Sequence, residues 1–311
     1  MARSDLHLLI VGAGAMGCLF AARLKRVGLQ VTLLEKAREV VDSINKRGIF
    51  VEGVSGQYQA TVPATSGRTA HQPDLVILCV KSYDTREAGE TLRPWLQPDV
   101  PILTLQNGVG NIEILQELFG KERVLGGVTA EGATLLGLGT IRHAGPGETI
   151  VGRGRDAEDI VSVFEKAGFN IRAVDDIDAF IWGKLVINVG INALAAVTGL
   201  KNGRLAELKG TRCVMEALVH EAVAVTKAKK IVIPYTDPLG RVVDVCKATA
   251  GNVASMLQDV LNKKRTEIDS INGAVVREGA ALGIPTPVNS TLTSLVRALE
   301  ETYPEGKNEP P

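Results

Sequence analysis

The chain has 311 residues, 45% of them hydrophobic and 23% charged, a composition typical of a globular protein with enough length for two domains. Lys plus Arg equals Asp plus Glu at 35 each, which argues against nucleic acid or an anionic membrane as the main partner. The four histidines lack metal-ligand spacing, so no metal is expected, and the four cysteines lack C-x-x-C spacing and are expected to stay reduced. No apolar run reaches the roughly 18–20 residues of a membrane span and the first residues lack a signal-peptide core, so we expect a cytoplasmic protein.

The first half of the chain alternates short apolar runs with amphipathic stretches. Strands are predicted at residues 7–11, 30–34, 74–80 and 102–105, with helices at 15–27 and 37–47. The run DLVILCV at 74–80 is apolar throughout, as expected of a strand covered on both faces. This pattern predicts an α/β fold, with a Rossmann-type, doubly wound parallel sheet. Residues 49–65 and 124–151 have antiparallel character and are expected to extend the edge of that sheet.

The pattern becomes helical after Val174. Helices are predicted at residues 177–197, 212–229, 238–262, 266–282 and 289–302. We therefore predict a dinucleotide-binding domain at 1–174 and an all-α substrate domain at 175–303. The polar, proline-rich residues 304–311 are expected to be a disordered tail.

A glycine pattern follows the first predicted strand. Gly12, Gly14 and Gly17 form G-x-G-x-x-G between that strand and the next helix. With Ala15 and Met16, they predict a turn that brings a cofactor pyrophosphate onto the backbone N–H groups of the helix start. The alternative is a glycine turn without a ligand, but the strand–loop–helix–strand context favours a dinucleotide.

Three charged residues follow the second predicted strand, where a Rossmann fold binds the adenosine ribose. Glu35 lies 18 residues after Gly17 and could accept from ribose hydroxyls, which favours NAD. Lys36 and Arg38 could instead hold a 2′-phosphate, which favours NADP. All three could also be a solvated helix start, and these residues alone leave the choice open.

Two polar residues follow later strands, at the sheet edge where such folds bind ligands. Lys81 comes directly after the run at 74–80, and Asn107 follows the strand at 102–105. Lys81 could therefore meet a cofactor phosphate or a substrate carboxylate, and the Asn107 amide could meet cofactor or substrate. A surface lysine and an ordinary Asn-Gly turn are the alternatives.

The helix predicted at 177–197 is almost entirely apolar, yet Lys184, Asn188 and Asn192 recur along it at every fourth position. This spacing places them on one stripe that drifts by about 40° per step at about 3.6 residues per turn. Burying these groups costs several kcal/mol unless partners exist, so the stripe indicates a polar cavity. A desolvated lysine has a lowered pKa and can act as a general acid. The alternative places Lys184 near the surface, with the asparagines bonded to loop backbone.

A further polar group surrounds a basic patch at 263–265. Asn252 and Ser255 precede the patch, and Glu267 follows it within Thr266–Asn272. Without further information, the segment after the patch could be only a helix start with acidic residues near its positive end.

Taken together, these segments resemble the ketopantoate reductase family from Gly12 to about Pro285. The resemblance is sharpest in WGKLVINVGIN at 182–192 and in SMLQD at 255–259 with RTEIDSING at 265–273. It implies NADPH-dependent reduction of 2-dehydropantoate to pantoate, on the pathway to pantothenate and coenzyme A. It also implies that Lys184 is the general acid on the C2 oxygen and that Glu267 orients it.

The same resemblance implies that substrate is held by Asn188, Asn192, Asn252 and Ser255, and that Lys81 and Asn107 line the cofactor side. Many family members carry an arginine at the end of the second strand, whereas this chain has Lys36 after Glu35. Lysine lacks the planar fork of arginine. NADPH is therefore the expected cofactor, with NADH left open.

Two other functions remain as alternatives. One is a related reductase or dehydrogenase for another small 2-keto or β-hydroxy acid, which could place a lysine and an asparagine four residues apart on the same helix. The other is a dinucleotide-binding sensor without turnover, which the combination of Lys184, Asn188 and Glu267 argues against. The only other partner the sequence leaves open is a second copy of the chain in a homodimer.

Overall fold

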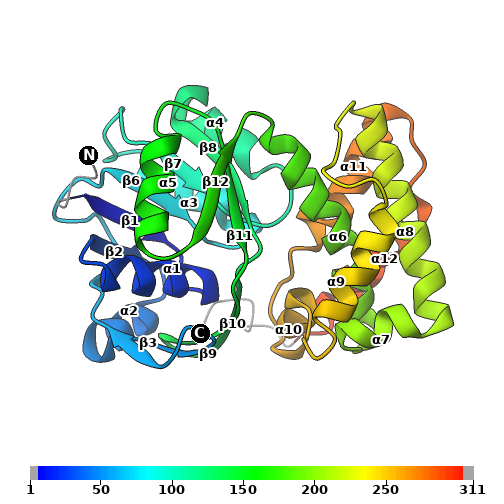
Figure 1. Cartoon of the computed structure of the whole chain (residues 1–311), viewed down its shortest axis with the longest axis horizontal. Helices are drawn as coiled ribbons and strands as arrows, with labels where there is room; N and C mark the ends of the chain where they lie inside the picture. The colour runs from blue at the N-terminus through cyan, green and yellow to red at the C-terminus, as the bar shows by residue number, and fades with distance from the viewer. Residues whose placement is uncertain (1–5, 304–311) are drawn as a thin grey trace. The chain divides into compact units, whose positions relative to one another are not determined.

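The computed structural model describes residues 6–303, and the tail predicted at 304–311 lies outside them. The chain forms two compact units (Figure 1). The first extends to Gln106 and resumes over Asn111–Ile177, whereas the second contains Asn107–Gly110 and the chain from Asp178 onward. The short return of the chain at Asn107–Gly110 was not indicated by the sequence pattern.

The main sheet of the first unit has eight strands in the order β12-β11-β8-β7-β6-β1-β2-β5. Its strands are β1 (His7–Val11), β2 (Gln30–Leu34), β5 (Ala64–Thr65), β6 (Leu75–Leu78), β7 (Ile102–Thr104), β8 (Val124–Thr129), β11 (Glu148–Gly152) and β12 (Asn170–Val174). Neighbouring strands from β5 to β8 are parallel, and β11 pairs antiparallel with β8. The predicted Rossmann-type sheet is thereby confirmed.

Helices cover both faces of this sheet, because consecutive residues of β1 enter different cores. Leu8 and Ile10 belong to the core that contains α1 (Ala15–Arg26) and α5 (Ala157–Lys166). Leu9 and Val11 belong to a second core with α3 (Thr85–Leu92) and α4 (Asn111–Phe119). Burial on both faces explains why these strands are continuously apolar in sequence. The remaining helix, α2 (Arg38–Arg47), packs into the first core through Ile44.

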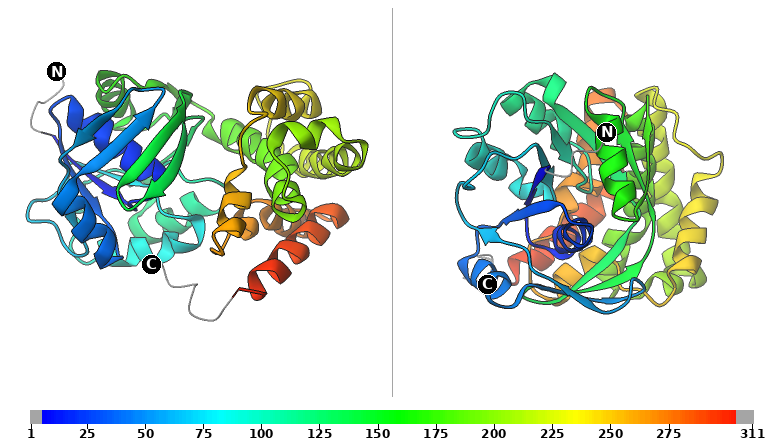
Figure 2. Two further views of the ribbon diagram at one scale, coloured as in Figure 1. Left: turned by 90° about the horizontal axis from the view of Figure 1, so that it is seen from below. Right: turned by 60° about the vertical axis from the view of Figure 1, so that its left-hand side comes forward.

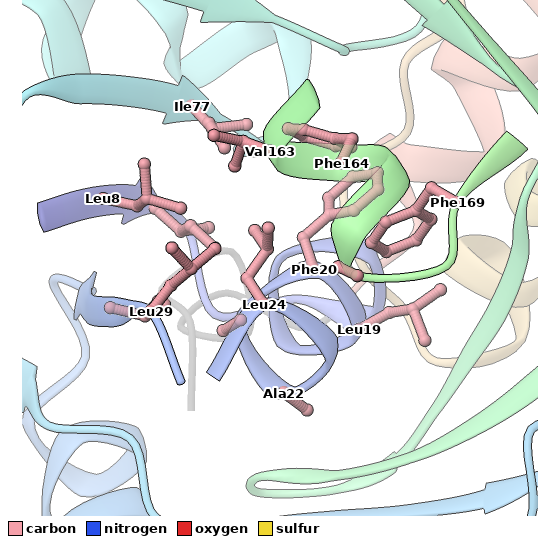
Figure 3. Packing of buried hydrophobic residues seen from close by; sticks show 14 of the residues in the cluster. Leu8, Leu19, Phe20, Ala22, Leu24, Leu29, Ile77, Val163, Phe164 and Phe169 are labelled. Carbon is pink, nitrogen blue, oxygen red and sulfur yellow. The ribbon is translucent and has the colours of Figure 1, made fainter. Parts of the chain in front are cut away.

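Three phenylalanines, one of them on α1 itself, fill the core beside this helix (Figure 3). The rings of Phe20, Phe164 and Phe169 lie with centroids 5.2–5.6 Å apart in tilted or edge-on pairs. Such aromatic pairs contribute about 0.5–1.5 kcal/mol each beyond their buried area. They connect α1, which begins at the glycine loop, to α5 and the chain that follows it.

A separate four-stranded sheet corrects the expectation that residues 49–65 and 124–151 only extend the main sheet. It has the order β4-β3-β10-β9, with strands β3 (Ile49–Gly53), β4 (Tyr58–Ala60), β9 (Gly132–Gly137) and β10 (Thr140–Gly145). β3 pairs parallel with β10, although they are distant in the chain (Figure 2). The physical reason is α1, whose outer side packs against all four strands and is covered by Ile49, Val51 and Ile141.

Among its described residues, the second unit contains helices joined by loops and no strand (Figures 1 and 2). Its helices are α6 (Ile177–Thr198), α7 (Asn202–Glu207), α8 (Lys209–Ala228), α9 (Pro238–Ala248), α10 (Ser255–Leu261), α11 (Asn272–Leu282) and α12 (Pro287–Glu301). α6 is long and apolar enough to span a membrane by length and composition, yet 67% of its most apolar window is buried inside the protein. Val186, Val189 and Ala193 of α6 join one core with residues of α8 and α9.

Two helices predicted as continuous are interrupted, which corrects the sequence interpretation. The stretch at 238–262 breaks between α9 and α10, where Thr249 Oγ1 donates to Val245 O at 2.7 Å and Asn252 N donates to Thr249 O at 2.8 Å. The stretch at 266–282 becomes a 3₁₀ turn, Ile268–Ser270, followed by α11. There Thr266 Oγ1 accepts from Ile268 N at 3.2 Å. Threonine side chains offer the backbone such alternatives to helical bonding.

Candidate active site

The glycine loop follows β1 and is shaped by two contacts that exclude any side chain. Gly12 has φ +100°, and a Cβ there would lie 2.9 Å from the backbone nitrogen of Val80. A Cβ on Gly17 would lie 1.9 Å from the carbonyl oxygen of Gly12. The loop can therefore turn between β1 and α1 only with glycine at both positions.

Gly14 differs, because a Cβ built there meets nothing within 4 Å. It is the N-cap of α1, and Ala15 and Met16 are the first two helical residues. The first turn of α1 has no acidic side chain, and the cap makes no side-chain hydrogen bond. A helix start of this kind directs backbone N–H groups and the positive dipole end outward, which fits the pyrophosphate of a dinucleotide.

The Glu35 carboxylate lies at the end of β2 and is bonded to the glycine loop. Its Oε2 accepts from Ala13 N at 2.8 Å, and its Oε1 accepts from Ala37 N at 3.0 Å. The sequence allowed this carboxylate to accept from ribose hydroxyls, but it did not indicate that the carboxylate also connects the loop to the end of β2. Each oxygen retains a second lone pair for a hydroxyl.

Lys36 is exposed and forms two ion pairs with residues that the sequence analysis did not single out. Its Nζ lies 3.1 Å from Asp84 Oδ1 and 3.1 Å from Glu87 Oε2. Asp84 ends the 3₁₀ turn after β6, and Glu87 lies in the first turn of α3. Arg38, the first residue of α2, is also exposed.

Lys81 follows β6 and is half-buried at the start of the 3₁₀ turn Ser82–Asp84. A polar network missed by sequence reasoning lies beside this turn. Gln106 Nε2 donates to Val80 O at 2.9 Å and to Thr85 Oγ1 at 2.8 Å. Gln106 thus fixes the chain on both sides of the turn that carries Lys81. The adjacent Asn107 belongs to the second unit, where Val109 N donates to Ser270 O at 3.1 Å.

The second unit holds the lysine of α6. Lys184 is half-buried, and Glu267 is only 6% exposed. Burial lowers the pKa of Lys184 to about 8, and the negative charge of Glu267 acts in the opposite direction. The structure therefore brings the two predicted catalytic residues together, with an amine able to exchange a proton near neutral pH.

The backbone around Glu267 is fixed from both sides. Thr266 N donates to Glu300 Oε1 of α12 at 2.7 Å, and Ile271 N donates back to Glu267 O at 3.1 Å. A buried amide chain follows: Asn272 Nδ2 donates to Asn289 Oδ1 at 3.0 Å. Asn289 Nδ2 in turn donates to Glu221 Oε2 at 2.7 Å. Bulk packing alone would not require such a polar network in the core.

The predicted substrate residues differ in exposure. Asn188 is half-buried and Asn192 is 5% exposed, both on α6, whereas Asn252 and Ser255 are exposed around the start of α10. Asn202, which sequence reasoning missed, connects to this group because its backbone N donates to Asn252 O at 3.1 Å. Among the described residues, its buried Oδ1 is one of the few side-chain atoms without a hydrogen-bond partner. The signal was a lone asparagine after the Gly-Leu-Lys turn, too common to be specific.

A glycine loop on a Rossmann-type sheet, with a desolvated lysine and a buried glutamate in a helical unit, defines a dinucleotide-dependent oxidoreductase. The chain belongs to the ketopantoate reductase family. The model of ketopantoate reductase PanE/ApbA matches residues 8–156, and the model of its C-terminal part matches residues 176–300. The resemblance inferred from the sequence is thereby confirmed.

Individual relatives agree over almost the whole chain. The 2-dehydropantoate 2-reductase of Pyrococcus horikoshii is 33% identical, over 95% of this chain and 98% of its own length. The crystal structure of a PanE/ApbA family ketopantoate reductase from Ralstonia eutropha JMP134 has a TM-score of 0.90 at 35% identity, over 96% of this chain and 99% of that one. D-mandelate dehydrogenase, solved with NADH and anilino(oxo)acetate, has a TM-score of 0.88 at 26% identity, with coverages of 96% and 99%.

Proposed function

We propose that the chain is an NADPH-dependent 2-dehydropantoate 2-reductase. It would reduce the C2 ketone of 2-dehydropantoate to the hydroxyl of pantoate, a step toward pantothenate and coenzyme A. The observation that carries the proposal is Lys184, a desolvated amine beside buried Glu267 in a chain of the ketopantoate reductase family. The dinucleotide supplies the hydride, and all other chemistry is assigned to the protein.

Lys184 is assigned the proton transfer. As hydride reaches C2, negative charge develops on the carbonyl oxygen, and the Lys184 ammonium stabilises that charge and donates its proton. The products are the alcohol, the oxidised dinucleotide and a neutral amine, which water reprotonates. Glu267 keeps the amine oriented and favours its charged form through its own negative charge.

Further polar residues of the second unit are assigned to the substrate. Asn188 and Asn192 continue the stripe of Lys184 along α6, and Asn252 and Ser255 lie around the start of α10. Amide and hydroxyl donors suit a carboxylate and a primary hydroxyl, the two polar ends of 2-dehydropantoate.

The cofactor is assigned to the first unit. The loop of Gly12, Gly14 and Gly17 would receive the pyrophosphate at the start of α1, where the open space beside Gly14 admits it. Lys36 is assigned the 2′-phosphate of NADPH, and Glu35 a ribose hydroxyl. Lys81 and Asn107 are assigned to the cofactor side of the reaction. The buried, core-forming character of α6 supports a soluble enzyme, to which we assign the cytoplasm.

A second candidate function is the reduction of a different small 2-keto acid. The similarity to D-mandelate dehydrogenase over 96% of this chain favours it, because that enzyme's ligands in the solved structure are NADH and an aryl oxoacetate. The two candidates share the chemistry at C2 and differ in what the pocket holds beyond it. Either one requires Lys184 as the proton donor.

The test is a spectrophotometric assay at 340 nm with 2-dehydropantoate and with the aryl keto acid benzoylformate, each with NADPH and with NADH. We expect the highest kcat/KM for 2-dehydropantoate with NADPH. Faster oxidation with benzoylformate would replace the first candidate with the second. If the protein bound the cofactor but neither keto acid caused its oxidation, the remaining function would be a dinucleotide-binding sensor without turnover.

A further inference from the structure

The preference between NADPH and NADH depends on what surrounds the adenosine ribose, which a Rossmann fold places at the end of β2. In this chain the residue there is Lys36, with the exposed Arg38 two positions further. Glu35 contacts backbone amides through both carboxylate oxygens and adds a negative charge beside the ribose position. Lys36 is the first cationic residue after β2, so a 2′-phosphate held there would contact its amine.

The amine of Lys36 is already engaged by two carboxylates. Asp84 and Glu87, here called the acidic pair, each place an oxygen 3.1 Å from Lys36 Nζ. The acidic pair comes from the 3₁₀ turn and helix that follow β6, far from Lys36 in sequence. A phosphate at the same amine must displace these carboxylates or share the amine with them, and both carboxylates repel it.

We infer that Asp84 and Glu87 are specificity-determining residues that act through Lys36 and lower the preference of this enzyme for a 2′-phosphate. A cofactor with a 2′-hydroxyl requires no such exchange, so the acidic pair leaves its affinity unchanged. This inference rests on the proposed dinucleotide site. It adds that Asp84 and Glu87 reduce the preference of that site for NADPH over NADH.

A purely structural role for the acidic pair is the competing explanation. Lys36 is 48% exposed and Glu87 is 63% exposed, as side chains. Exposed ion pairs stabilise proteins by about 0–1 kcal/mol, so these contacts contribute little as a tether between β2 and α3. A structural role also predicts that removing the acidic pair changes the affinities for NADPH and NADH equally. Competition for the amine predicts a change only for NADPH, which carries the 2′-phosphate.

The experiment measures binding of 2′,5′-ADP and of 5′-ADP by calorimetry, because these adenosine halves report the ribose site without turnover. In Glu87→Gln and in Asp84→Asn, we expect the ratio of affinities, 2′,5′-ADP over 5′-ADP, to rise about two- to fivefold at low salt. The affinity for 5′-ADP should stay at the wild-type value. The rise should shrink at high ionic strength, because the charges involved are solvent-exposed.

Two controls isolate the acidic pair. Glu90→Gln removes the same charge from the same helix, and Glu90 is not among the groups that act on Lys36, so its ratio should stay at the wild-type value. In a Lys36→Ala background, Glu87→Gln should change the ratio by less than half as much as in the wild type. Unchanged ratios in both acidic-pair variants, or an equal rise in Glu90→Gln, would overturn the inference. A wild type that binds neither nucleotide would instead contradict the dinucleotide site, and the inference with it.

Discussion

The role proposed for Lys184 as a general acid is favoured by its apolar surroundings. Trp182, Leu185 and Val186 next to it on α6 are at most 5% exposed, and a charged amine among such residues loses hydration. Desolvation lowers its pKa to about 8, against the opposing effect of Glu267. The amine is therefore still protonated near neutral pH, yet gives up its proton more readily than an ordinary lysine.

Replacing Lys184 by alanine removes this acid. We expect Lys184→Ala to lower kcat by about 10²–10⁴, the usual contribution of a positioned general acid. Single-turnover oxidation of the cofactor at 340 nm measures it. Lys209→Ala, which removes an exposed lysine at the start of α8, is the control and should keep wild-type turnover. Near-normal kcat in Lys184→Ala would assign proton donation to another group.

The pH dependence has a definite sign. Lys184 donates only when protonated, so kcat/KM for ketone reduction should be level below pH about 8 and fall about tenfold per unit above it. The negative charge of Glu267 raises the Lys184 pKa, so Glu267→Gln should move this decline to lower pH. An inflection that stays fixed in Glu267→Gln would show that the titrating group is not Lys184.

At the residue scale, the sequence reveals groups whose partners lie on the same element. The spacing of Lys184, Asn188 and Asn192 on one apolar helix is local and was read correctly as a stripe. The Lys36 contacts with Asp84 and Glu87 could not be predicted, because they depend on how β2 and β6 are placed in the sheet. Asn202 was missed for the same reason, since its contacts with Thr249 and Asn252 cross from α7 to the end of α9.

At the scale of elements, the loop before α1 contains one glycine that the fold requires and another that only cofactor binding would require. Gly14 has φ −72° and open space where a Cβ would be, so alanine fits the fold there. We expect Gly14→Ala to retain the wild-type Tm but to lose most cofactor affinity, because its methyl group would occupy the position assigned to the pyrophosphate. Differential scanning fluorimetry and calorimetric titration measure the two quantities.

Gly17→Ala is the matched comparison. Its methyl group would lie 1.9 Å from a backbone oxygen, a contact that no side-chain rotation relieves. This variant should therefore lose both Tm and cofactor affinity. If Gly14→Ala bound cofactor as well as the wild type, the pyrophosphate would not lie at the start of α1.

Glu221 of α8 holds the first turn of α12. It accepts from Val288 N at 2.8 Å, from Asn289 N at 2.9 Å and from Asn289 Nδ2 at 2.7 Å. Glu221→Ala leaves the two backbone N–H groups without their acceptor, while Asn289 Nδ2 keeps its bond to Leu218 O. We expect the change to lower the free energy of unfolding by about 2–4 kcal/mol. Urea denaturation measures this change. Glu216→Ala, at an exposed position of the same helix, should stay within about 0.5 kcal/mol of wild type.

Strong periodicity predicted the central strands β1, β2, β6 and β7 and the helices α1, α2, α6, α8 and α12, whereas α3, α4, α5 and α7 were not predicted separately. β2 and the start of α6 lie where the sequence pattern indicates. The breaks before α10 and α11 were missed because the flanking apolar pattern continues across them, while Thr249 and Thr266 bond to nearby backbone. The second sheet was missed because the pairing of β3 with β10 joins segments almost 90 residues apart.

At the scale of the whole molecule, the fold class followed from the order of the elements. Alternating strands and helices, then helices alone, predict a parallel sheet unit and a helical unit. The return of Asn107–Gly110 to the second unit could not be foreseen, because it depends on long-range contacts: Val109 packs against the core of the second unit, and its N donates to Ser270 O. The net charge of zero carries no information about the site, whose charges are local.

Each unit contains one of the two tryptophans, so tryptophan fluorescence can report the effect of cofactor binding on each unit separately. Trp95 belongs to the first unit and Trp182 to the second. We expect NADP⁺ at 100 times its Kd to stabilise the first unit by about 2.7 kcal/mol, which follows from mass action. In Trp182→Phe, where Trp95 alone reports, the fluorescence melting midpoint should rise by several degrees.

The reciprocal variant and a binding-deficient one complete this test. In Trp95→Phe, the midpoint reported by Trp182 should rise by no more than that reported by Trp95, because the assigned nucleotide contacts lie almost entirely in the first unit. Adding Gly14→Ala to Trp182→Phe should remove the rise, since the start of α1 no longer admits the pyrophosphate. A rise in the melting midpoint reported by Trp182 alone would place the nucleotide in the helical unit. That result would contradict the proposal that the glycine loop and the start of α1 bind the pyrophosphate.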